Sequence, residues 1–455
     1  MYLWGRKKGI NLLTVADFTH PIWVRQARAA LEEKFEGIYK VRNEEVLKQQ
    51  LGYLKNTSFF GPYFILTTEI SCIYTERGRV HKIHNLVFAP DFETVFKINQ
   101  ELEKRGFNLR ADGRPILGIS ARNLLELLYG IDERIFVIPC HVWTPWFSLY
   151  GSSSGYDSIN DCFGDYSGKI TAVETGLSSD PSMNWRIKEL ENRQIVSFSD
   201  SHSLEKIGRE NTVLEIKNQI SNIKNDEKKL EITYKDIIGA FRGDESPNLR
   251  IKYTVEFYPE EGKYHFSGHR ACGVSYSPED IKEKGVICPS CQRHLTVGVM
   301  NRVEKLAGSS AENFVLEKDE MGVSWVKDKE ERSFDKLRTL TSQRPPYVSL
   351  VPLLEILAEA LGSGTGSQTV LTTYDNLVTN IGSEFEVLLR GSIDKIRTVA
   401  GDRAAEAIKR VRDRSISVVP GFDGEYGKVK IWLDEKEGVK KAEKKEEKVQ
   451  LGLGF

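Results

Sequence analysis

The 455-residue sequence lacks long apolar runs and has almost no excess of charge of either sign. No apolar stretch approaches the roughly 18 residues that a membrane-spanning helix needs, and the N-terminus has none of the regions of a secretory signal peptide. The formal net charge is −1, so DNA binding would depend on local basic patches. A Walker A sequence is also absent, which argues against an ATP-driven motor. We therefore expect a cytoplasmic protein that does not contact membranes.

Strand-like and helical patterns divide the chain into four regions. From residue 1 to 245, apolar runs such as INLLTV, YFILTTEISCIY and QIVSFSDSH alternate with amphipathic stretches, which predicts an α/β domain, either a barrel or a distorted one. Residues 246–305 hold short β-like segments around a cysteine cluster, and residues 306–435 are mainly helical. Residues 436–455 are a charged tail that ends in the apolar VQLGLGF. In an α/β barrel the active site lies at the carboxyl ends of the strands, so the residues there matter most.

Acidic and histidine side chains recur where the predicted strands end. They are Asp17, His20, Glu69, His84, His141, Glu174, Asp200 and His202. For each one alone, an ordinary role in a loop or in the core competes with metal binding. The series predicts a metal site, because imidazole with carboxylate suits Zn²⁺, Mn²⁺ or Fe²⁺ and carboxylates extend the range to Mg²⁺. A cluster of two or three such ions can activate water and stabilise a phosphoryl group under attack.

The segment GHRACGVSYSPEDIKEKGVICPSC has the spacing of a structural zinc site. Its four ligands would be His269, Cys272, Cys288 and Cys291, arranged as H-x₂-C and C-x₂-C knuckles. His265 is the main alternative for the histidine ligand, and His294 is the next. With four protein ligands, the ion would stabilise the fold without taking part in chemistry.

Several motifs together resemble a known family. ADFTHP, TTEISCIY, HKIHNLVFAP, ETGLSSDPSMNWR and SFSDSHS are similar to the PHP (polymerase and histidinol phosphatase) phosphoesterase domain, and in particular to its endonuclease Q branch of DNA repair enzymes. The resemblance extends through the cysteine segment to PGFDGEYGKVKIW and covers nearly the whole chain. It implies a PHP-type distorted (β/α) barrel with a small zinc-binding subdomain and a C-terminal helical DNA-binding domain.

The resemblance also assigns roles to the residues at the strand ends. It implies that the metal ligands are Asp17, His20, Glu69, His84, His141, Asp200 and His202, that Glu174 is a nearby acid, and that Glu69, His141, Glu174 and Asp200 are catalytic. The family carries an H-x-H pair on a strand before the D-x-x-H motif, whereas Met1 to Gly9 resembles the end of the helix that follows that strand. We expect that the sequence starts late; a true loss of the pair would weaken metal binding and the nuclease.

Two loops and one helix are candidates for contacts with DNA. An enzyme that acts on a damaged base must extrude it from the duplex, and aromatic side chains can stack on the neighbouring bases. Candidate contacts are Trp146 for stacking, Ser178, Ser179 and Asn184 for a flipped base, and a basic stripe of Lys409, Arg410, Arg412 and Arg414 for phosphates. A packed loop and a solvated helix face are the alternatives.

The C-terminal QLGLGF resembles the short peptides that bind bacterial sliding clamps. Its anchors would be Gln450, Leu451, Leu453 and Phe455, tethered by the charged linker. An apolar terminus without a partner is the alternative.

The sequence and the resemblance together predict a metal-dependent DNA repair endonuclease. It would use two or three Zn²⁺, Mn²⁺ or Mg²⁺ ions and a metal-activated hydroxide to cleave the phosphodiester 5′ of uracil, hypoxanthine, xanthine or an abasic site. A small-molecule PHP phosphatase and a DNA-binding protein without nuclease activity are the alternatives.

Overall fold

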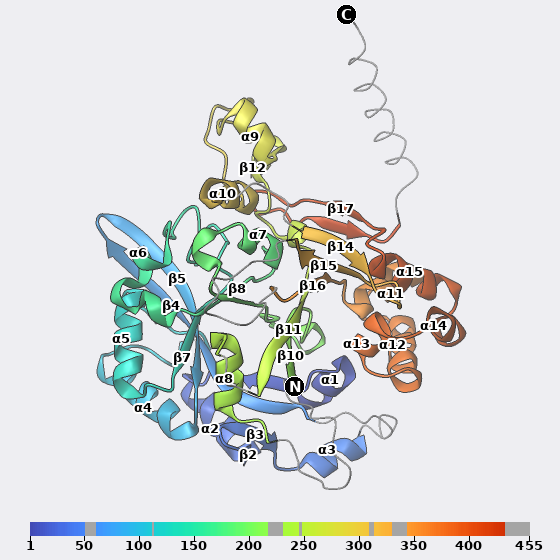
Figure 1. The fold of residues 1–455 in the computed structure, drawn as a ribbon, viewed down its shortest axis with the longest axis horizontal. Helices are drawn as coiled ribbons and strands as arrows, with labels where there is room; N and C mark the ends of the chain where they lie inside the picture. The colour runs from blue at the N-terminus through green and yellow to red at the C-terminus, as the bar shows by residue number, and fades with distance from the viewer. Residues whose placement is uncertain are drawn as a thin grey trace, which may run out of the picture.

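The structure, a computed structural model, describes residues 1–50, 61–111, 113–216, 231–244, 248–308, 314–329 and 344–432. Figure 1 shows a mixed α/β body, a block of helices beside it, and a small projecting segment that carries α9 and β12. None of the helices in these ranges is long and apolar enough to cross a membrane.

The largest sheet has seven strands. They are β1 (Leu12–Val15), β2 (Leu31–Phe35), β3 (Ile38–Val41), β4 (Tyr63–Glu76), β5 (Arg79–Ala89), β6 (Ile116–Leu117) and β7 (Phe136–Pro139), in the order β2-β3-β4-β5-β7 with β1 and β6 paired to β4. β4 and β5 form a long antiparallel hairpin whose two turn residues, Arg77 and Gly78, have φ angles of 49° and 74°. Two positive φ values suit the tight turn that matches the twist of paired strands.

Helices cover both faces of this sheet (Figure 1). The helices of this part are α1 (Tyr2–Lys8), α2 (Pro21–Ala30), α3 (Glu44–Gln50), α4 (Phe92–Lys104), α5 (Ala121–Ile131), α6 (Ile159–Phe163), α7 (Pro181–Trp185) and α8 (Tyr234–Arg242). Leu66 and Ile70 of β4 share a core with α4 and α5, whereas Ile65 shares a second core with α8. Successive strand residues point to opposite faces, so Glu69 points to the α8 side.

A second sheet and a strand pair complete the α/β body. The second sheet runs in the order β10 (Asn211–Ile216), β11 (Leu249–Glu256), β16 (Tyr347–Ser349), β15 (Ser324–Asp328) and β14 (Phe314–Lys318), and the pair is β8 (Ala172–Glu174) with the parallel β9 (Gln194–Val196). The expected α/β class is therefore confirmed. A barrel is not seen, because the described strands form separate open sheets and the central β4–β5 connection is an antiparallel hairpin where a barrel needs a helical crossover.

The projecting segment is attached to the body through a buried arginine. It contains β12 (Ser267–His269), β13 (Val274–Tyr276), α9 (Pro278–Lys284) and, at its base, α10 (Val299–Leu306). Arg302 of α10 donates hydrogen bonds to the carbonyl oxygens of Tyr150 and Tyr156, at 2.7 and 2.9 Å. These bonds anchor the segment to the loop that follows β7.

The helical block has its own core and contacts the first helix of the chain. It consists of α11 (Leu353–Leu361), α12 (Gln368–Asn380), α13 (Glu384–Leu389), α14 (Ile393–Ala400) and α15 (Asp402–Arg412), followed by the hairpin of β17 (Ser417–Val419) and β18 (Lys428–Lys430). Lys8 of α1 and Glu384 of α13 form a buried ion pair with an N–O distance of 2.7 Å. Figure 1 shows α1 beside α13.

Candidate functional site

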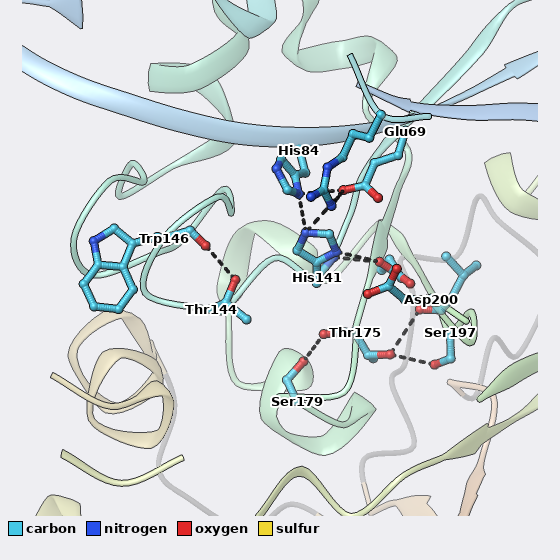
Figure 2. A network of polar contacts seen from close by, with 12 residues as sticks. Glu69, His84, His141, Thr144, Trp146, Thr175, Ser179, Ser197 and Asp200 are labelled. Atoms are coloured by element: carbon cyan, nitrogen blue, oxygen red, sulfur yellow. Dashed lines mark hydrogen bonds and ion pairs between the residues drawn. The ribbon is translucent and has the colours of Figure 1, made fainter. Parts of the chain in front are cut away.

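Glu69, His84 and His141 meet on the side of the large sheet that faces α8. Ser71 pairs with His84 across the β4–β5 hairpin, and Glu69 lies two residues earlier on β4, so the two side chains share a face. The Glu69 Oε1 to His84 Nδ1 distance is 2.6 Å, and His84 Nδ1 lies 2.8 Å from His141 Nε2. Figure 2 shows the three side chains pointing toward one another. Strand alternation thus brings Glu69 and His84 together, and the loop after β7 adds His141.

The ionisation of this cluster suits cation binding. Burial acts to raise the pKa of Glu69, but the hydrogen bond from His84 and the nearby His141 and Arg114 lower it to about 2. Burial lowers the pKa of His84 to about 4, although Glu69 opposes the shift. At neutral pH, Glu69 is therefore a carboxylate and His84 is a neutral imidazole, the forms in which these side chains bind metals.

Three of the residues predicted as ligands have positive φ angles within four residues after a strand. The values are 62° for Asp17, 38° for His141 and 40° for Asp200. Such conformations are uncommon for residues other than glycine and concentrate at functional sites. A Cβ atom on Gly113 would lie 2.5 Å from the Asp17 carboxyl carbon, and one on Gly176 would lie 2.5 Å from the His141 Cβ. Both glycines therefore leave the space that Asp17 and His141 occupy.

Glu174 holds the backbone of His141. The His141 N–H donates a hydrogen bond of 2.6 Å to Glu174 Oε2, and Glu174 is fully buried at the end of β8. Burial raises the pKa of Glu174 well above its usual value, and the charge of Asp200 adds to the shift. A cation between these acids would reverse the shift, since an adjacent positive charge favours the carboxylate.

One large cleft collects most of the predicted residues. Its volume is about 1720 Å³, and its lining includes Asp17, Glu69, His141, Glu174, Asp200 and His202. His84 is buried beside Glu69 and is not part of the lining. The His202 side chain is exposed, with Nδ1 3.1 Å from the carbonyl oxygen of Asp200.

His20 is placed differently from the other predicted ligands. Its Nδ1 accepts a hydrogen bond of 3.4 Å from the Trp23 N–H, so it caps the N-terminus of α2, and it is not part of the cleft lining. The two residues of the D-x-x-H motif therefore lie apart: Asp17 lines the cleft, and His20 caps the N-terminus of α2.

Two residues at the site were not predicted from the sequence. Arg114 lines the cleft, with Nη1 3.3 Å from Glu69 Oε1. Cys140 belongs with Glu69 and His141 to a group whose ligand atoms lie within 4.8 Å of one another. Burial raises the pKa of the Cys140 thiol well above its usual value, and Glu69 adds to this. The position of Cys140, directly before His141 at the end of a strand, was a usable signal, whereas Arg114 lies in a loop without a recognisable pattern.

The chemistry of the residues in the cleft fits a divalent cation. They combine carboxylates and imidazoles, which suit Zn²⁺ and Mn²⁺. The buried Nε2 atom of His84 has no hydrogen-bond partner among the described residues. A buried polar atom of this kind is costly unless another group satisfies it.

The second candidate metal site lies in the projecting segment. The ligand atoms of His269, Cys272, Cys288 and Cys291 all lie within 4.8 Å of one another. Burial acts to raise the pKa of Cys288, but backbone N–H groups of Cys291 and Ser290 lower it to about 6, which favours the thiolate. Of the three histidines considered, the structure places His269 in the group. His265 is buried with Nδ1 3.0 Å from the Pro259 carbonyl oxygen, and His294 is exposed.

The loop residues considered for DNA contacts differ in exposure. Trp146 is partly exposed and packs edge-on against Tyr264, with ring centroids 5.3 Å apart. Ser178 is half-buried. Ser179 and Asn184 are fully buried and hydrogen-bonded to each other at 3.1 Å. In this structure, these two side chains therefore stabilise the loop.

The basic stripe predicted on α15 is incomplete. Lys409 is exposed, and Arg410 pairs with Glu406 at 2.9 Å. The inclusion of Arg412 was wrong, because its side chain is buried and donates hydrogen bonds to the carbonyl oxygens of Val387, Leu388, Gly391 and Met321. A guanidinium group that satisfies four carbonyl groups inside the helical block is not available to phosphates. Arg414 also turns inward, with its guanidinium Nη1 3.3 Å from Ser349 Oγ.

The residues predicted to anchor the C-terminal peptide to a sliding clamp lie outside the described residues. They are Gln450, Leu451, Leu453 and Phe455.

Comparisons with known proteins show which proteins this chain is similar to. A family model described as the MJ0043 C-terminal domain matches residues 352–415. The protein MJ0043 of Methanocaldococcus jannaschii is 30% identical over 289 residues, which are 63% of this chain and 31% of that protein. This chain thus spans about a third of its length. The protein YqxK of Bacillus subtilis is 25% identical over 426 residues, which cover 93% of this chain and 89% of YqxK.

Two solved structures match almost the entire chain. The lesion-specific endonuclease PfuEndoQ of Pyrococcus furiosus superposes with a TM-score of 0.70 at 27% identity, covering 96% of this chain and 92% of that one. Endonuclease Q in complex with a 27-mer duplex, which carries an abasic lesion at the active site, superposes with a TM-score of 0.71 at 27% identity, covering 95% and 91%. The chain therefore has the fold of a lesion-specific endonuclease. Over almost its whole length it is similar to endonuclease Q, and the resemblance drawn from its motifs is confirmed.

Proposed function

We propose that this protein is a DNA repair endonuclease that cleaves the phosphodiester 5′ of a deaminated base or an abasic site. The observation that carries the proposal is the cluster of Glu69, His84 and His141 at a large cleft, within a fold shared with endonuclease Q. The relative whose structure contains a duplex with an abasic lesion supports duplex DNA as the substrate class.

Residues around the cleft would hold the catalytic cations. Glu69, His84 and His141 would bind one ion, and Asp17, Glu174 and Asp200 are the acids available for others. Bound divalent cations polarise a phosphate and lower the pKa of a bound water molecule. Glu69 is already ionised, and the carboxyl of Glu174 orients His141 through its backbone N–H. The role of the protein is to keep these groups fixed before the substrate arrives.

Arg114 would bind a phosphate of the substrate strand. Its guanidinium group lies at the cleft beside Glu69, and 38% of its side-chain surface is exposed. Guanidinium groups bind phosphate oxygens through paired hydrogen bonds. In the proposed function, Arg114 positions the scissile phosphate while Glu69 holds the cation.

The remaining assignments follow the same proposal. Residues 1–245 would form the phosphoesterase domain and residues 246–305 a zinc-binding domain with one structural Zn²⁺. Residues 306–435 would form the DNA-binding domain predicted as helical, although its strands β14, β15 and β16 join the second sheet and its helices begin only at Leu353. Residues 436–455 would be a tail that docks on a sliding clamp. Deleting residues 450–455 is expected to abolish clamp binding and to leave cleavage of short duplexes unchanged.

A nicking assay tests the proposed function. The full chain is incubated with Mn²⁺ or Mg²⁺ and end-labelled duplexes that carry one uracil, inosine or abasic site, with an undamaged duplex as the matched control. We expect a nick 5′ of the lesion that leaves a 3′-hydroxyl and a 5′-phosphate. Lesion binding without a nick would favour a DNA-binding protein instead. Phosphate release from small esters alone would favour a phosphatase.

A further inference from the structure

Glu256 is a buried acid at the junction between the second sheet and the candidate metal centre. It is the last residue of β11 and its relative exposure is 0%. Its Oε1 accepts a hydrogen bond of 2.5 Å from Ser197 Oγ and another from the Thr254 hydroxyl, and its Oε2 accepts one of 3.2 Å from Thr175 Oγ1. Three hydroxyl groups from three strand ends therefore surround one carboxyl group.

Two of these hydroxyl groups belong to the segments that carry the predicted acids. Thr175 directly follows Glu174 at the end of β8, and Ser197 directly follows β9, three residues before Asp200. The two hydroxyl oxygens also lie 2.7 Å apart, and Figure 2 shows this contact below His141. The carboxyl group of Glu256 thus ties together the ends of β8 and β9.

The position of the β8 end, which Glu256 holds, also affects His141. Glu174 accepts the His141 N–H at 2.6 Å, so a displacement of the β8 end moves the acceptor that fixes the His141 backbone at its φ of 38°. Burial raises the pKa of Glu256 to about 7, against the effect of its hydroxyl partners. Burying an acid without a cationic partner is costly, so packing alone gives no reason for a glutamate here.

We propose that Glu256 is a positioning residue for the metal centre, holding the ends of β8 and β9 so that Glu174, Asp200 and His141 face the cleft. The inference rests on the proposed function, because it assumes that these residues bind catalytic cations. Groups behind the ligands of metal sites commonly change metal affinity or activity by about 10- to 100-fold when they are replaced.

The test compares Glu256→Ala and Glu256→Gln in the full chain, with Glu384→Gln as a matched control. Glu384 is also a buried acid that accepts a hydroxyl hydrogen bond, from Tyr374, but it is paired with Lys8 and lies in the helical block. The readouts are Mn²⁺ binding by calorimetry, with His141→Ala defining the contribution of the cleft, and kcat and KM on a duplex with one abasic site. Folding is checked by thermal unfolding.

We expect Glu256→Ala to raise the Kd for Mn²⁺ and lower kcat by about 10- to 100-fold, with KM for the duplex within about 2-fold. Glu256→Gln should stay within about 5-fold of wild type, because an amide still accepts and donates hydrogen bonds to hydroxyl groups. Glu384→Gln should lower thermal stability without changing Mn²⁺ affinity. If Glu256→Ala does not fold, Thr175→Val and Ser197→Ala replace it, each with a smaller expected increase in Kd.

Unchanged Mn²⁺ affinity in folded Glu256→Ala would overturn the inference, as would an equal loss in Glu384→Gln. If wild type binds Mn²⁺ but does not nick the lesion duplex, the proposed function fails, and the Mn²⁺ titration still decides the role of Glu256. If wild type shows no Mn²⁺ binding that depends on His141, both proposals are overturned.

Discussion

The Cys/His cluster takes its ligand atoms from residues 269–291, whereas the cleft cluster combines Glu69 of β4, His84 of β5 and His141 of the loop after β7. The first consists of one histidine and three cysteines in a projecting segment. The second consists of carboxylate and imidazole groups beside a large cleft. A closed set of three thiolates and one imidazole suits a structural ion, and an open oxygen and nitrogen set leaves room for water and substrate.

The comparison teaches how the two sites depend on the rest of the fold. Two short knuckles can form the Cys/His cluster with little help from distant residues. The cleft cluster needs correct strand pairing, three uncommon backbone conformations and two glycines that leave space. We therefore expect zinc to control local folding and the cleft to respond to substitutions far from it in the sequence.

The largest expected effect is the loss of zinc from His269→Ala. With the cleft loaded with Mn²⁺, removing one of four ligands should reduce bound zinc from about one ion per chain to nearly none, since structural zinc contributes about 10 kcal/mol to folding in small modules. Elemental analysis and limited proteolysis of residues 266–298 measure the effect. His265→Ala is the matched control and should keep its zinc, because His265 lies outside the cluster. Zinc loss in the control alone would assign the ligand to His265.

Substitutions in the cleft should instead reduce catalysis and leave the fold intact. His141→Ala is expected to lower kcat for nicking by at least about 1,000-fold, because several kcal/mol of transition-state stabilisation by a cation would be lost. The zinc bound by the Cys/His cluster and the melting temperature should change little. Single-turnover nicking measures the rate, and His294→Ala serves as the exposed-histidine control. A rate within tenfold of wild type would remove His141 from the site.

The importance of the space next to His141 can be tested without substituting a predicted metal ligand. Gly176→Ala places a Cβ 2.5 Å from the His141 Cβ at a φ of 59°, and we expect kcat to fall by about 10- to 100-fold. Gly362→Ala is the control for backbone strain, because its φ is 61° and an added Cβ would meet nothing within 4 Å. Both variants should lose stability in urea, Gly176→Ala more than Gly362→Ala because of the added overlap with His141, but only Gly176→Ala should lose activity. Equal activities would show that the close contact is unimportant.

A smaller effect on nicking is expected from substitutions of Arg114, the residue proposed to bind a phosphate of the substrate strand. Arg114→Ala should lower kcat/KM by about 10-fold, and Arg114→Lys should recover part of the loss, because an ammonium group keeps the charge without the paired hydrogen bonds. Steady-state nicking at two salt concentrations measures this. Arg122→Ala, which removes a surface pair with Asp165, is the control. Wild-type kinetics in Arg114→Ala would exclude the proposed phosphate contact.

The smallest effect separates helix capping from metal binding at His20. His20→Ala should cost about 1 kcal/mol of stability, and His20→Ser should restore it, because serine is a favourable N-cap residue. Both variants should nick at nearly the wild-type rate. Loss of nicking in both variants would mean instead that His20 is a ligand, as its motif predicts. Urea unfolding and nicking rates provide the two readouts.

Much of the site was predictable where the pattern is local or periodic. The H-x₂-C and C-x₂-C spacing identified all four residues of the Cys/His cluster, and the strand ends identified most of the acids and histidines near the cleft. Arg412 shows the limit of such patterns. A charged residue on a helix is predicted to be exposed to solvent, and only the structure shows that the Arg412 side chain is buried among backbone carbonyl groups. Arg114 and Glu256 carry no signal in their own segments, because their roles depend on contacts with other strands.

The sequence by itself determined the α/β class, the spacing of the two knuckles and the resemblance to endonuclease Q, because short spacings, periodic apolar runs and motifs are properties of the chain. Only the tertiary structure decided that the described sheets stay open, that His269 rather than His265 joins the cysteines, and that Glu69, His84 and His141 meet. The physical reason is that pairing of strands distant in sequence, positive φ angles and close packing around Gly176 arise from the whole fold.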